Sequence, residues 1–441
     1  MSSDFRRALG PFDATMVVVG GIIGAGIFIN PYIVAQRLDS PALVILAWVA
    51  GGFLALAGAF AFAELGSLFP RAGGPYVYLR EAFHPLLGFL YGWAALLLIQ
   101  GGGIAAVAIT FATYTLRLIG RPEASAALLA VLAITVVAAI NYLGVKPGSR
   151  LLNVLVVLKV LALGALIAAG FALPAAAPAA APAGDPAFLP VVAFGAALVP
   201  VMFSYGGWQS ANWLAEELRE PRRDLPRALI AGTLIVVIVY VLVNVVYLRA
   251  LGHEGLAGTL TPAADAARRA FGAGGDRFIA AAIAVSTFGF LSLTMLAPTR
   301  IYYAMAADGL FFPAVGRLHT RFRTPSLAIV LQAGWAILLA LTGSYAQLVD
   351  TVVFADWIFF GLAVVAVFVF RRRIPLHSRP AGTYAAPGHP FIPALFILAA
   401  AYIVVSVIAA NPIRSGIGAL LLAAGVPAYL YWRSRAGSAD R

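Results

Sequence analysis

The sequence contains no cysteine, few charged residues and only five histidines. Without cysteine, the chain can form no disulfide bond, thiolate metal site or cysteine nucleophile. The histidines are scattered and have no metal-ligand spacing, so we expect neither a metal site nor a cofactor. A phosphate-binding loop of the GxxxxGK[ST] type is also missing, which argues against a pump driven by ATP.

Apolar residues dominate the composition of the sequence. They make up 62% of the 441 residues, only 11% are charged, and the mean hydropathy is +0.93. A soluble domain with this balance would have too few polar groups to cover its surface. Apolar runs of about twenty residues, the length that one helix needs to cross the hydrocarbon core, recur from end to end. The sequence therefore predicts an all-α integral membrane protein, a single domain over 1–441, with about twelve spans at 13–37, 41–68, 84–117, 124–143, 148–173, 188–216, 226–250, 277–306, 325–343, 347–370, 391–411 and 414–433.

The net charge of +12 comes from basic residues in the short loops between these runs. Positive charge in this place sets the orientation of membrane proteins, so nucleic acid is not the expected partner. The larger basic set lies on the side of the N-terminus, which predicts that both termini are cytoplasmic in a plasma or inner membrane. The first run lacks a small-residue cleavage site and is expected to be a mature span.

Two connections between spans have a distinct composition. The segment 174–186 is rich in proline and alanine and is predicted to be an outside loop. The segment 70–85 carries Arg71, Arg80 and Glu81 among aromatic residues. It is expected to form a short helix on the cytoplasmic face.

Two glycine clusters interrupt the apolar pattern. The first span contains Gly20, Gly21, Gly24 and Gly26, and the sixth span contains the stretch 203–209 after Pro200. Each cluster alone fits tight helix packing or a proline kink. Their recurrence five spans apart favours two broken helices in an inverted-repeat transporter. This pattern predicts a first five-helix repeat at 13–173, a second at 188–370, and two additional helices at 391–433.

Broken helices would leave polar backbone groups free in the middle of the bilayer. Free amides at a helix start favour a carboxylate, whereas free carbonyl groups accept hydrogen bonds from an ammonium group. A zwitterionic amino acid carries both groups. The two clusters therefore point to amino acids as the small-molecule partner.

Lys159 and Asp356 are the deep ionisable residues. Lys159 lies nine residues after Arg150, about 13–14 Å into a core of about 30 Å, so its expected partners are the freed carbonyl groups of the first span. A purely structural lysine is the alternative. Three roles are open for Asp356: it pairs with Lys159, takes part in proton coupling, or faces a water-filled vestibule. Gating or structural ion pairs are expected for the charged residues near the cytoplasmic ends of their spans, which are Glu64, Glu216, Glu217, Arg300 and Asp308.

These residues resemble the amino acid–polyamine–organocation superfamily, and most closely its L-type amino acid transporter branch. The matching stretches are Ile22–Phe28, the stretch from Phe203 to Gln209 that runs on to Glu220-Pro221, and Ser286–Pro325. The resemblance covers most of the chain in order. It implies a LeuT-like fold in which helices 1 and 6 are discontinuous.

The resemblance also implies roles for individual residues. The backbone of Ile23, Gly24, Ala25 and Gly26 would hold the substrate carboxylate. Carbonyl groups around Phe203, Ser204 and Gly206 would accept from the ammonium group, and Phe203 would close the site from outside. Lys159 would replace a sodium ion of sodium-coupled relatives, with Ser286 close to it. Trp357 would shape the side-chain pocket. Gln209 stands where relatives often have asparagine, and Asp356 where some have it. The expected site is completed by two further residues, Tyr205 and Gly207.

The expected activity is sodium-independent transport of neutral L-amino acids by alternating access, through exchange or uniport-like carriage. Animal L-type carriers join a glycoprotein through a cysteine, and a chain without cysteine cannot form that link. A proton-coupled amino acid symporter and a polyamine or organic-cation carrier remain alternatives. An enzyme is not expected, because a membrane-embedded lipid-modifying enzyme should show a cluster of polar catalytic groups at one membrane face, and the sequence contains none.

Overall fold

The computed structural model describes residues 9–439 except 72, 122–124, 144–148, 173, 175–189, 318 and 323. Within these residues, nine helical segments are long and apolar enough to cross a membrane. Three shorter apolar helices lie at Ala126–Tyr142, Val191–Tyr205 and Ser326–Thr342. The chain is thus a multi-pass, all-helical membrane protein. The predicted loop at 174–186 lies, apart from Pro174, outside the described residues.

The first half of the chain runs through one short and several long helices. Proline stands at the start of many of them, where its missing N–H costs no hydrogen bond and its fixed φ suits the first turn. The elements are α1 (Pro11–Ile22), α2 (Gly26–Arg37), α3 (Pro41–Leu68), α4 (Pro75–Ala82), α5 (Pro85–Ala94), the π-helical turn η1 (Ala95–Gln100), α6 (Gly101–Leu118), α7 (Ala126–Tyr142) and α8 (Ser149–Ala172).

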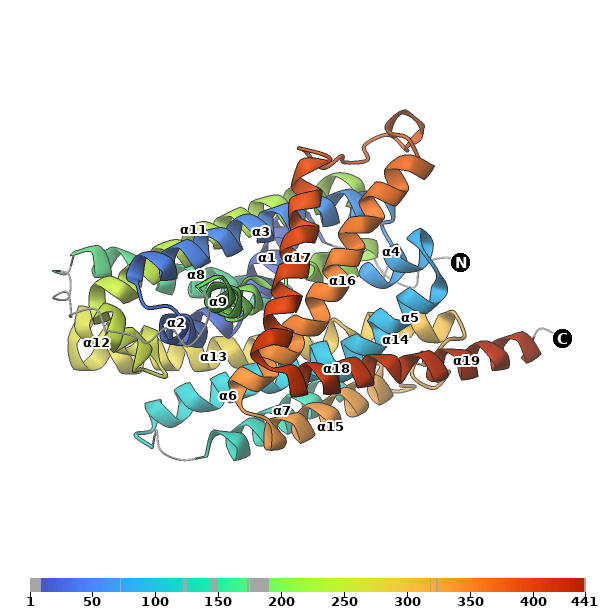
Figure 1. Ribbon diagram of the computed structural model, residues 1–441. Coiled ribbons are helices and arrows are strands. Elements are labelled where there is room, and N and C mark those ends of the chain that lie inside the picture. The colour runs from blue at the N-terminus through green and yellow to red at the C-terminus, as the bar shows by residue number, and fades with distance from the viewer. Residues whose placement is uncertain are drawn as a thin grey trace.

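In the second half, α3 lies beside the long helix α11, and α16 lies beside α17 (Figure 1). The elements are α9 (Pro190–Tyr205), α10 (Ser210–Trp213), η2 (Ala215–Glu217), α11 (Pro221–Ala257), α12 (Pro262–Phe271), η3 (Gly272–Gly274), α13 (Gly275–Leu296), α14 (Thr299–Ala307), α15 (Ser326–Thr342), α16 (Tyr345–Arg373), η4 (Leu376–Ser378), α17 (Phe391–Ala410), α18 (Pro412–Ala423) and α19 (Gly425–Ala439).

Some boundaries differ from the sequence prediction. The helix expected over 226–250 begins at Pro221, because proline fits the first helical position and Pro226 is tolerated early in the helix. The span expected over 277–306 divides near Pro298 into α13 and α14. The amphipathic helix α12 was not predicted, since its 10 residues are too few to cross a membrane and the prediction rested on apolar runs of membrane-spanning length. The short helix expected within 70–85 is confirmed as α4.

A buried carboxylate ties α3 to the connection between α16 and α17. Glu64 is 1% exposed, and its oxygens accept hydrogen bonds from Arg371 at 2.6 Å and Arg379 at 2.7 Å. The backbone N–H of Ala386 donates to it at 2.8 Å. A buried charge of this kind is tolerated only when it is paired and hydrogen-bonded. The expected ion pair at Glu64 is confirmed.

Two further ion pairs lie near the end of the bundle that carries α4 and α14, opposite the end that carries α12 (Figure 1). Arg300 donates to Glu217 at 2.6 Å. Asp308 accepts from Arg80 and, at 2.5 Å, from the hydroxyl of Tyr76. Burial and the Asp308 carboxylate raise the pKa of Tyr76, so its hydroxyl remains a neutral donor. Ion pairing is thereby confirmed for Glu217, Arg300 and Asp308.

Candidate binding site

The first glycine cluster breaks its span. Helix α1 ends at Ile22 and α2 begins at Gly26, and the chain bends at Ile23, Gly24 and Ala25 between them. The amide groups in the first turn of α2 have no acceptor one turn earlier within the helix. Together with the helix dipole, these amides form a place where negative charge is favoured.

The second cluster breaks the span that begins with α9. Regular helix ends at Tyr205, and Gly206–Gln209 form turns before α10 begins at Ser210. The N–H of Gly206 returns to the carbonyl groups of Met202 at 2.9 Å and Phe203 at 3.2 Å. The side chain of Gln209 accepts from the N–H of Gly207 at 3.0 Å. Gln209 therefore stabilises the break from within.

The two breaks touch through glycine backbones. Gly207 has φ of 117°, a left-handed conformation that glycine adopts without strain. A Cβ on Gly21 would lie 3.0 Å from the carbonyl oxygen of Gly207, and a Cβ on Gly207 would overlap the carbonyl group of Gly21. Only glycine at both positions permits this approach. The glycine clusters therefore do both things that the sequence suggested: they interrupt the helices and they allow the helices to pack closely.

A cavity lies where the breaks meet α6, α13 and α16. It leaves about 100 Å³ open to the centres of water-sized spheres, whereas one water needs about 10–15 Å³ on that measure. Most of its lining is apolar, as is usual for sites that bind small molecules. Nine of the predicted site residues line it, namely Gly24, Ala25, Gly26, Phe203, Gly206, Gly207, Gln209, Asp356 and Trp357.

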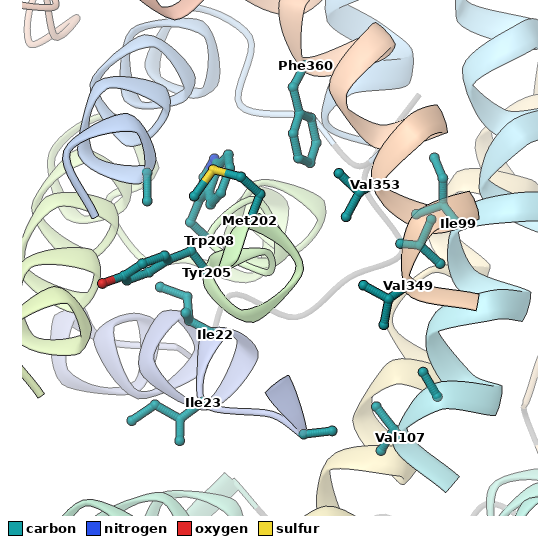
Figure 2. Close-up of a cluster of buried hydrophobic side chains, with 14 of the residues drawn as sticks. Ile22, Ile23, Ile99, Val107, Met202, Tyr205, Trp208, Val349, Val353 and Phe360 are labelled. Carbon is teal, nitrogen blue, oxygen red and sulfur yellow. The ribbon is translucent and has the colours of Figure 1, made fainter. Parts of the chain in front are cut away.

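Figure 2 shows how side chains are arranged around α9. Val349, Val353 and Ile99 lie on one side of this helix, whereas Tyr205 and Trp208 lie on the other. The hydroxyl of Tyr205 donates to the carbonyl oxygen of Trp48 at 3.0 Å, and its ring is fully buried. The structure therefore corrects the placement of Tyr205. Its side chain packs against α3, on the face of α9 that is turned away from the cavity, and does not line the cavity.

Ser204 also points away from the cavity. Its hydroxyl donates to the carbonyl oxygen of Pro200 and accepts from Asn30, each at 2.8 Å. A Cβ on Gly26 would approach this hydroxyl to 2.5 Å, so Ser204 packs tightly against the start of α2. Its side chain joins the two broken helices and does not face the space between them.

Lys159, on α8, contacts the break in the first span. Its Nζ donates to the carbonyl oxygen of Ile23 at 2.5 Å, and the residue is 8% exposed. The expected contact with a freed carbonyl group is confirmed. Lys159 lines two small cavities together with Ser286, whose Oγ has no hydrogen-bond partner among the described residues. The ring centre of Phe290 lies 5.7 Å from Nζ. Phe290 also lines the main cavity, which is the one between the two breaks.

Asp356 and Trp357 come from α16. Trp357 is 2% exposed and stacks on Phe396 with ring centres 5.2 Å apart, which fixes its orientation beside the cavity. No ion pair between Asp356 and Lys159 occurs in the described part of the chain. The alternative that these two residues pair is therefore not realised.

Several lining residues were missed by the sequence analysis. Gln100 and Ile99 come from η1, a π-helical turn, and such turns are frequent at functional sites. Gln100 is followed directly by three glycines, and this polar residue in an apolar span was the available signal. Helix α13 adds Phe290, Leu293 and Thr294.

A further set of contacts joins α2, α9 and α16. The guanidinium group of Arg37 lies 3.6 Å from a carboxylate oxygen of Asp350 and donates to the carbonyl oxygen of Ala196 at 2.5 Å. The rings of Phe203 and Tyr345 meet edge to face with centres 6.3 Å apart. The contacts of Arg37 hold α2 against α9 and α16, and the ring contact joins α9 to α16.

A mostly apolar cavity between two interrupted membrane helices is typical of secondary transporters. The chain belongs to the amino acid permease family, whose model matches residues 9–426. It is 30% identical over 437 residues to the serine/threonine exchanger SteT of Bacillus subtilis (strain 168), covering 98% of both chains. It is 29% identical to the large neutral amino acids transporter small subunit 2 of Homo sapiens, covering 98% of this chain and 82% of that one. The cystine/glutamate transporter of Pongo abelii is 30% identical over 419 residues. The resemblance to the L-type branch is confirmed.

Proposed function

We propose that this protein exchanges neutral L-amino acids across a cell membrane without sodium, by alternating access. The observation that carries the proposal is the meeting of two broken helices at one cavity. The amide groups that begin α2 would hold the substrate carboxylate, and the backbone at the end of α9 would accept from its ammonium group. Neutral cargo follows from the mostly apolar lining and from the relatives named for serine, threonine and large neutral amino acids.

Lys159 supports independence from sodium. Its ammonium group places a positive charge against the carbonyl oxygen of Ile23, where a bound cation would otherwise neutralise the freed oxygen. A cation that is part of the chain cannot be released with the substrate. Transport would then not need a sodium gradient.

The proposed architecture has two inverted repeats of five helices, at 13–173 and 188–370, and two further helices at 391–433. The nine long and three shorter apolar helices in the described residues support this count and would supply the crossings. The broken spans would take the first position in each repeat, as expected for inverted repeats. Both termini would lie in the cytoplasm, on the side favoured by the basic loops.

The test is uptake into liposomes that contain the purified protein. Vesicles preloaded with unlabelled amino acids and empty vesicles receive a labelled panel, with and without sodium and with and without an inward pH gradient. Preloading should accelerate uptake of neutral amino acids, and sodium should have no effect. Strict sodium dependence would contradict the role of Lys159. Uptake driven by the pH gradient alone would favour the proton-coupled alternative.

A further inference from the structure

Asp356 is an unpaired acid in the wall of the cavity. Its Oδ1 is buried and has no hydrogen-bond partner among the described residues. The neighbouring lining from the same helix is apolar or aromatic, with Val352, Val353 and Phe360. Oδ1 itself is shielded from the cavity, but the residue is only half-buried, so the rest of its carboxyl group reaches the cavity surface without a hydrogen-bond partner among the described protein groups.

The cations in the described part of the chain do not supply that partner. Lys159 lines the two smaller cavities and is hydrogen-bonded to Ile23, away from the space that Asp356 faces. The remaining polar side chains in the main cavity include Gln100 from η1 and Gln209, which already accepts from the backbone. A ligand in the main cavity is thus the natural partner for Asp356.

We propose that Asp356 is a specificity-determining residue that selects neutral amino acids with a hydrogen-bond-donating side chain, chiefly a hydroxyl group. This inference rests on the proposed function. A hydroxyl group satisfies the acid in either state, because it donates to a carboxylate and also accepts from a protonated carboxyl group. A site that binds a substrate hydroxyl rejects the analogue without it, since the buried polar group is then left unpaired.

Threonine and valine provide the test, because they have nearly the same shape and differ in one hydroxyl group. The wild-type chain in liposomes should transport threonine with a kcat/KM at least about tenfold above that for valine. Asp356→Leu should bring this ratio to about one or invert it, mainly through a gain in valine uptake. Asp356→Asn should keep a preference for threonine, because the amide oxygen still accepts a hydrogen bond.

Asp39→Leu is the matched control, since Asp39 is exposed between α2 and α3 and lies outside the cavity. Each variant is checked for folding by a monodisperse elution profile. If Asp356→Leu does not fold, the threonine-to-valine ratio of Asp356→Asn provides the test. The inference is overturned by equal transport of threonine and valine in the wild type, which leaves the proposed function intact. It is also overturned by a preference for 2,3-diaminopropionate, or by equal loss of both substrates in a folded Asp356→Asn. Failure of the wild type to carry any amino acid would remove the proposed function as well.

Discussion

Lys159 donates a hydrogen bond of 2.5 Å to the carbonyl oxygen of Ile23, the first residue after α1 ends. The pair joins α8 to the break in the first span. Tyr240 donates to the carbonyl oxygen of Ile22 at 2.9 Å, so two side chains from different helices bond consecutive carbonyl groups at this break. The unwound segment is therefore a supported structure, shaped before a ligand arrives.

Lys159→Ala should lower the rate of transport at least about tenfold while the protein still folds. The variant leaves the Ile23 oxygen without its partner, which costs about 1–3 kcal/mol, and removes the positive charge behind the site. Exchange in liposomes measures the rate, and thermal unfolding in detergent measures the fold. Unchanged exchange would assign the lysine a merely structural role.

Gly207→Ala should abolish transport and lower the yield of folded protein. The new Cβ would overlap the backbone of Gly21, and its φ of 117° is strained for alanine. Gly164→Ala is the control, because no atom lies within 4 Å of the added Cβ on α8. Size-exclusion profiles and exchange rates compare the two. If both variants behaved alike, close contact of the two breaks would not be required.

Glu64→Gln should destabilise the protein by about 3–5 kcal/mol, because it leaves two buried guanidinium groups without a counter-charge. Denaturant or thermal unfolding in detergent gives the free energy of unfolding. Glu220→Gln removes an exposed carboxylate that pairs with Arg223, and it should produce no measurable change. A similar, small effect of both substitutions would show that the Glu64 cluster does not anchor the loop after α16.

The sequence predicted the parts of this site that arise from local chemistry. Apolar length gave the spans, and glycine clusters gave the breaks at 23–25 and 206–209, because glycine weakens a helix wherever it stands. The depth of Lys159 predicted its carbonyl partner, since an ammonium group at that depth needs an acceptor.

What the sequence did not predict depends on rotation and packing. Tyr205 and Phe203 lie two residues apart, yet only Phe203 faces the cavity, because successive helical residues point about 100° apart. Gln100 and the three glycines after it mark an irregular place in an apolar span, but no local pattern shows that a π-helical turn forms there and turns Gln100 into the cavity. That Asp356 has no hydrogen-bond partner among the described residues is likewise a property of the assembled fold.

The absence of cysteine permits the most direct test of the central claim, that the cavity between the breaks binds the amino acid. Gly103→Cys places a single thiol in the cavity lining, at a glycine whose added Cβ meets no atom within 4 Å. The measurement is the rate of thiol alkylation as the concentration of a transported amino acid rises, with Asp39→Cys as the exposed control. We predict that the amino acid slows alkylation at 103 over the same concentration range that saturates exchange, and leaves the control unchanged. Equal alkylation at 103 with and without a saturating amino acid would contradict the account.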